Sequence, residues 1–147
     1  MAQSSSANQL IDMMEEWYSK LPALPRNWKD VIVQIAPWLA LIFGIIGVLG
    51  SLVAVGLLTF LAPFILIGGG IGAASGGVIG AILALVASVL LLLAFPGTRA
   101  RKISGWNLLF WSEVASVVST IVALSVGGVV GALIGFYILF QIKSYYK

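Results

Sequence analysis

Long apolar runs and short polar stretches alternate along the chain. The run from Val31 to Phe95 contains no charged residue, and a second apolar run follows the basic residues at 99–102. About 18 consecutive apolar residues already suffice for a helix that spans a bilayer. The pattern therefore predicts an all-α integral membrane protein.

Proline and glycine divide these runs into four expected spans. Pro63 and the three glycines at 68–70 are the strongest helix breakers inside the first run, and Pro96–Gly97 follows it. Gly127–Gly128 allow a tight turn within the second run. Residues 37–147 are thus expected to form a four-transmembrane-helix bundle, each span being near the ~20 residues that a bilayer needs. The expected spans are about 38–62, 71–95, 106–125 and 128–142.

An amphipathic helix is expected before the first span, within a cytoplasmic interfacial segment at residues 1–36. At 100° per residue, the apolar side chains of residues 10–21 fill an arc of roughly 160°, and acidic side chains lie opposite. The sequence LPALP at 21–25 ends this helix, because proline cannot continue it. We interpret it as a helix that lies on lipid headgroups or folds over the bundle. A docking or oligomerisation helix is the alternative.

The placement of charge predicts how the bundle is oriented. Only 9% of the residues are charged, against about 25% in soluble domains, and the net charge is +3. With four spans, all eight basic residues lie on one side, and the loops near 63–70 and 126–128 carry none. The positive-inside rule then places both termini in the cytoplasm, with the bundle in the plasma (inner) membrane. No signal peptide is expected, because the first apolar run is too long for one.

Small residues recur at every fourth position on two of the expected spans. In lipid, such stripes allow helix backbones to approach closely. The partner helix can belong to the same chain or to another, and the spacing leaves both open. A nucleotide loop is excluded for GGGIGAASGGVIG at 68–80, because the lysine and the acidic residue that such loops need are absent. The predicted packing residues are Gly68, Gly72, Gly76, Gly80, Ala84, Gly127, Gly131 and Gly135.

Glu113 is the only charged side chain expected within the membrane, where an ionisable group is a functional candidate by default. Ser112, Ser116 and Thr120 share its span, and the antiparallel fourth span brings Gln141 and Lys143 to a similar depth. The favoured interpretation is a structural hydrogen bond or ion pair between Glu113 and Gln141 or Lys143. A proton or cation site is the alternative.

The composition limits the chemistry that the chain can perform. It has no cysteine and no histidine, which removes thiolate nucleophiles, imidazole bases and the usual zinc ligands. We expect no catalytic residue, metal, cofactor or nucleic-acid partner. The expected role is that of a non-enzymatic interaction, scaffold or assembly component, with lipid and either a second copy or another membrane protein as partners. The alternative is an oligomeric channel or transporter that uses Glu113.

Overall fold

A computed structural model describes residues 2–147, with side chains except at 2–5 and 69–75, a stretch that includes the predicted packing residue Gly72. Within these residues the chain is helical and contains no strand, which confirms the expected all-α class. The helices are α1 (Ala2–Ser19), α2 (Arg26–Arg99), α3 (Ile103–Val122), α4 (Val126–Ile142) and the short 3₁₀ helix η1 (Lys143–Tyr145).

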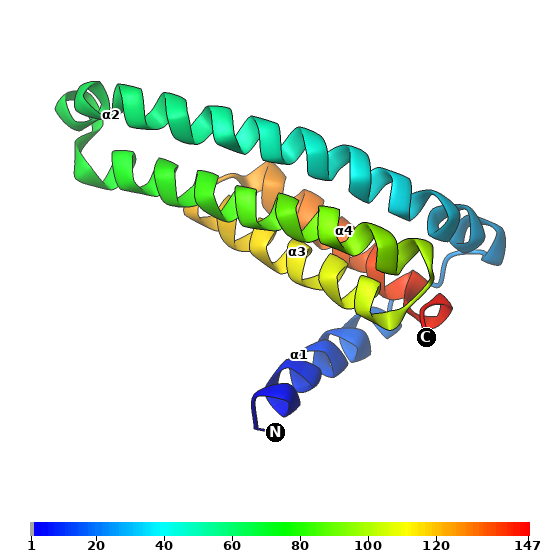
Figure 1. The fold of residues 1–147 in the computed structure, drawn as a ribbon. Helices are drawn as coiled ribbons and strands as arrows, with labels where there is room; N and C mark the ends of the chain where they lie inside the picture. The colour runs from blue at the N-terminus through cyan, green and yellow to red at the C-terminus, as the bar shows by residue number, and fades with distance from the viewer. Residues whose placement is uncertain (1) are drawn as a thin grey trace.

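The longest helix, α2, folds back on itself as a hairpin (Figure 1). Its arms Arg26–Gly68 and Gly76–Arg99 run in opposite directions, and the rings of Trp38 and Phe95 meet across them at 5.9 Å. The helix continues through Pro63, where a break was predicted. The expected loop between the first two spans is therefore wrong, because the chain reverses within helical backbone.

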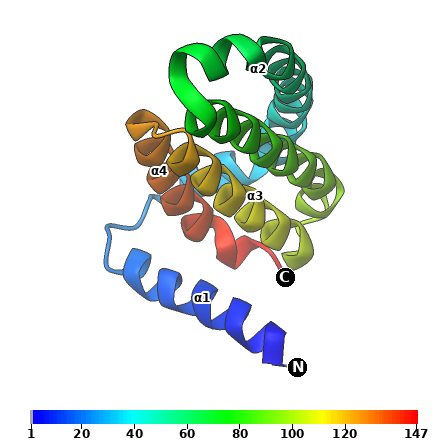
Figure 2. The same ribbon diagram turned by 90° about the vertical axis from the view of Figure 1, so that its left-hand side faces the viewer.

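The helices form three layers (Figures 1 and 2). The α2 hairpin lies on one side, α3 and α4 form an antiparallel pair in the middle, and α1 lies on the other side. A cluster of buried apolar residues joins the layers at the end where the chain terminates. It consists of Ile11, Val33, Trp106, Phe110, Phe136, Ile142 and Tyr146.

A tight turn between α3 and α4 explains where α3 ends and α4 begins. Leu124 has φ 53°, and the next amide, that of Ser125, donates to the Thr120 carbonyl at 2.9 Å. This is a Schellman termination, in which one residue takes the left-handed conformation. The Ser125 hydroxyl then accepts from the Gly128 amide at 3.3 Å and caps α4. The predicted turn at Gly127–Gly128 is wrong, since both residues are already helical.

The basic residues gather at one end of the bundle. Arg101, in the turn between α2 and α3, also has a φ of 53°. Its carbonyl accepts from the Lys147 amide at 3.0 Å, and the Lys147 carbonyl accepts from the Ile103 amide at 3.0 Å. The C-terminus is thus tied to the α2–α3 turn. Arg26 and Lys29 lie beside the last residues of the chain at the same end.

Three segments of the described chain are long and apolar enough to cross a membrane, which indicates a membrane protein. They are Arg26–Gly68, Gly76–Arg99 and Val126–Tyr145. The expected span at 106–125 corresponds to α3, which is not among them and carries Asn107, Glu113 and several hydroxyls. The four-span count therefore stays a prediction.

Candidate functional site at Glu113

The polar face of α3 is turned toward the second arm of α2. Ser112 is 2% exposed, and its hydroxyl donates to the Ala87 carbonyl at 2.8 Å. Two turns later the Ser119 hydroxyl donates to the Gly80 carbonyl at 2.9 Å. Interhelical bonds of this kind satisfy hydroxyls where water is excluded. The face therefore holds two helices together.

Ser116 and Thr120 lie on the same side of α3. With Ala84 they line a cavity of about 200 Å³ against the second arm of α2. The Thr120 hydroxyl donates to the Val117 carbonyl at 2.9 Å within its own helix. The structure thus separates the predicted hydroxyl residues from Glu113, which lines a different cavity.

Glu113 is partly buried and points toward α4. A Cβ built on Gly135 would lie 2.5 Å from its Oε1 atom, so any larger residue at this position would force the carboxyl group to move. The carboxylate also lines a cavity of about 400 Å³ between the two arms of α2, α3 and α4. Among the described residues it has no hydrogen-bond or ion-pair partner. An acidic side chain is thus held against an apolar hollow.

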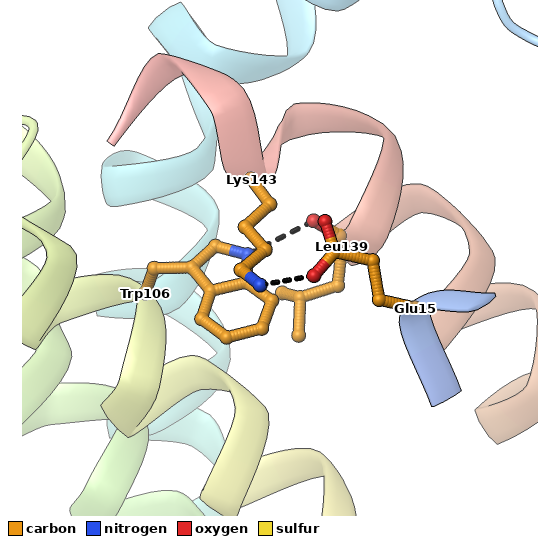
Figure 3. Close-up of polar contacts among 4 residues, drawn as sticks. All are labelled: Glu15, Trp106, Leu139 and Lys143. Atoms are coloured by element: carbon orange, nitrogen blue, oxygen red, sulfur yellow. Dashed lines mark hydrogen bonds and ion pairs between the residues drawn. The ribbon is translucent and has the colours of Figure 1, made fainter. Parts of the chain in front are cut away.

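The two polar residues expected to pair with Glu113 are engaged elsewhere. The Gln141 side-chain oxygen accepts from the Leu24 amide at 3.2 Å. Lys143 forms an ion pair with Glu15 on α1, and its ammonium lies 5.3 Å from the centre of the Trp106 ring (Figure 3). The favoured interpretation of Glu113 as their partner is therefore wrong, because the Leu24 amide engages Gln141 and Glu15 of α1 engages Lys143.

Trp106 anchors this end of the bundle, a role that the sequence analysis missed. Its side chain is fully buried, and its ring nitrogen donates to the Leu139 carbonyl at 2.9 Å (Figure 3). Its ring packs against Phe110 and Phe140 at 5.7 and 5.5 Å. Tyr18 of α1 stacks on Phe140 at 5.4 Å. An aromatic cluster thus links α1, α3 and α4.

One face of α1 makes the docking contacts and a neighbouring apolar face is left exposed. Ile11 is buried, Met14 and Tyr18 are half-buried, and their spacing of three and four residues places them on one side of the helix. Met13 and Trp17, on the adjoining side, are 52% and 70% exposed. The expected apolar arc of α1 is therefore divided into two parts, one that contacts the bundle and one that is exposed.

The Tyr18 hydroxyl adds a further docking bond, to the Leu133 carbonyl at 3.3 Å. Burial raises the pKa of this phenol above its ordinary value of 10.0, and the negative charge of Glu113 raises it further. The hydroxyl therefore stays protonated at neutral pH and remains a donor.

We expect Glu15→Gln to loosen α1, because it removes the ion pair with Lys143. Glu15 is 47% exposed, so the loss is about 0.5–1 kcal/mol, or a few-fold rise in the undocked population. Tryptic cleavage at Lys20 and Arg26 under native conditions measures it. Glu16→Gln is the matched control, since Glu16 faces away and reaches only Lys20, at 3.9 Å. Equal cleavage of both variants would contradict the docking role.

The six described glycines among the predicted packing residues fall into two groups. Gly80 and Gly135 lie against Ser119 and Glu113 of the same chain. Gly68, Gly76, Gly127 and Gly131 have no atom within 4 Å of where a Cβ would be. Contacts that the sequence analysis did not single out join Gly47 to Ser88 and Gly97 to Gly105.

Comparison with known proteins found no matching family, no similar curated protein and no similar solved structure.

Proposed function

We propose that this chain is a polytopic membrane protein that acts by association, as an interaction or assembly component, with both termini cytoplasmic. Four helices cross the membrane: the two arms of α2, α3 and α4. The shielding of the polar face of α3 by α2 supports counting α3 as a span, because its hydroxyls bond within the bundle. The common location of the C-terminus, the basic start of α2 and the basic α2–α3 turn supports the orientation.

The observation that carries the proposal is the open part of the glycine stripes. Gly127 and Gly131 lie on the same helix as Gly135, yet of these three only Gly135 meets another helix among the described residues. Val130 and Ile134 flank the open glycines and are 51% and 56% exposed. In lipid, helices associate through close packing at small residues. A surface of this kind on α4 suits a second copy of the chain.

We expect Gly131→Leu to abolish association while the single chain stays folded, because the added side chain projects into open space. Self-association is measured by energy transfer between labelled copies in liposomes, with circular dichroism as the check on folding. Ile121→Leu is a neutral control, since Ile121 lies on α3 and is already large and 55% exposed. Energy transfer that is unchanged in Gly131→Leu, or absent from the wild type, would contradict the proposal.

An oligomeric channel or transporter is the second candidate, and it is favoured by the Glu113 carboxylate, which has no hydrogen-bond or ion-pair partner among the described residues. Under the main proposal, purified protein in liposomes gives no ion flux above that of empty vesicles. Flux that Glu113→Gln abolishes would establish the second candidate instead. The matched control is Glu16→Gln, which removes a carboxylate outside the bundle.

A further inference from the structure

The cavity beside Glu113 has the form of a ligand site. Its volume of about 400 Å³ falls within the ~300–1,000 Å³ of small-molecule pockets. Apart from Glu113, its described lining is apolar and includes Leu39, Phe43, Leu91 and Ile138. Leu39 and Phe43 are 42% and 57% exposed, so the cavity opens sideways between α2 and α4. A molecule can therefore enter from the lipid side.

Within the described part of the chain, no residue supplies a countercharge to the carboxylate at this cavity. No lysine or arginine is among the lining residues, and Lys143 is held by Glu15 and Trp106. Tyr18 is close enough to feel the charge of Glu113, but its hydroxyl is directed to the Leu133 carbonyl. An unpaired charge in apolar surroundings is costly. A cationic occupant would remove that cost.

The few oxygen atoms that line the cavity determine which kind of cation it can bind. Calcium takes six to eight oxygen ligands and magnesium six, and both rely on several oxygens from protein or water. Here the lining offers a single carboxylate among aliphatic and aromatic side chains. An ammonium group needs one such partner, and hydrocarbon attached to it gains by contact with the walls. The Phe43 ring is a further favourable surface for a cation.

We propose that this cavity binds a lipophilic ammonium ion, with the cationic group on Glu113 and the hydrocarbon part against Leu39, Phe43 and Leu91. Gly135 is a positioning residue in this site, because the space above its Cα holds the carboxyl group. Binding at this site does not depend on association through the open glycines, which lie elsewhere on α4.

The test measures binding of decylammonium to the full chain in nanodiscs by calorimetry, with empty nanodiscs subtracted and decanol as the uncharged probe. The wild type should prefer the ammonium. Glu113→Gln should bind it about tenfold more weakly or worse, as expected for the loss of one charge-assisted contact, and should bind decanol unchanged. Gly135→Ala should also weaken ammonium binding, because the new methyl group displaces the carboxylate.

Gly131→Ala is the matched control, since it adds the same methyl group to the same helix in open space and should leave binding unchanged. Equal affinity of the wild type for both probes would show a site for hydrocarbon only, such as a lipid acyl chain, and would overturn the proposal. Unchanged ammonium affinity in a folded Glu113→Gln variant would overturn it as well. The comparison of the two probes uses the wild type alone and does not depend on how the variants fold.

Discussion

Gly105→Ala is expected to destabilise the protein by about 3 kcal/mol, at the upper end of the usual cost of overpacking. Gly105 lies in the first turn of α3, where that helix crosses the end of α2. A Cβ at this position would lie closer than 3.0 Å to backbone atoms of Gly97 and Thr98, and a Cβ at Gly97 would lie 2.7 Å from the Gly105 Cα atom. Backbone cannot rotate away as a side chain can, so the two helices must separate.

The free energy of unfolding of the purified protein, from reversible denaturation in mixed micelles, measures this loss. Gly131→Ala is the control, because it makes the same chemical change in a helix with open space above it. That variant should be as stable as the wild type or gain up to about 1 kcal/mol from the better helix propensity of alanine. Similar effects at the two positions would show that the crossing is not tightly packed.

Trp106→Ala is the second substitution with a large expected effect, a loss of about 3–5 kcal/mol. The side chain is fully buried and contacts two rings of the aromatic cluster. Its loss would leave a cavity, remove the bond to the Leu139 carbonyl and take away the surface beneath Lys143. Because Lys143 also holds Glu15, α1 should undock in the same variant.

Denaturation in mixed micelles and tryptic cleavage of α1 read these two effects separately. Trp111→Ala is the matched control: Trp111 is 38% exposed and meets the cluster only edge-on, at Phe110. It should cost far less and leave α1 docked. A Trp106→Ala variant as stable as the Trp111 control would show that the cluster does not hold this end together.

The helical class was predictable because the apolar runs are long and nearly free of charge. The ends of the helices were less predictable than the class. Glycine pairs drew attention to 127–128, whereas the turn is made by Leu124, whose left-handed conformation a sequence gives no reason to expect of leucine. The sequence predicted a reversal near the glycines of α2, but it predicted a loop where the structure has continuous helix.

The candidate site was predictable in part. Glu113 stood out as the lone charge in an apolar region, and Ser112 and Thr120 as its neighbours on α3. Its relation to Lys143 was not predictable, because Glu15 competes for that lysine from 128 residues away in the sequence. Gly131 and Gly135 belong to the same four-residue repeat, yet Gly135 lies against the Glu113 carboxyl group and Gly131 has no atom within 4 Å of where a Cβ would be. Only the packing of helices distinguishes them.

The unequal lengths of the helices have a consequence for the surrounding lipid. The first arm of α2 has 43 residues and the apolar span Val126–Tyr145 has 20, and the hairpin extends beyond α3 and α4 (Figure 1). At 1.5 Å per residue these are contour lengths of about 64 and 30 Å, against the ~30 Å of a hydrocarbon core. Hydrophobic mismatch on one flank alone would tilt the first arm of α2 or thicken the bilayer beside it, while the bilayer beside α4 would keep its usual thickness. Such a one-sided profile is expected to draw the protein to boundaries between thick and thin regions of a membrane.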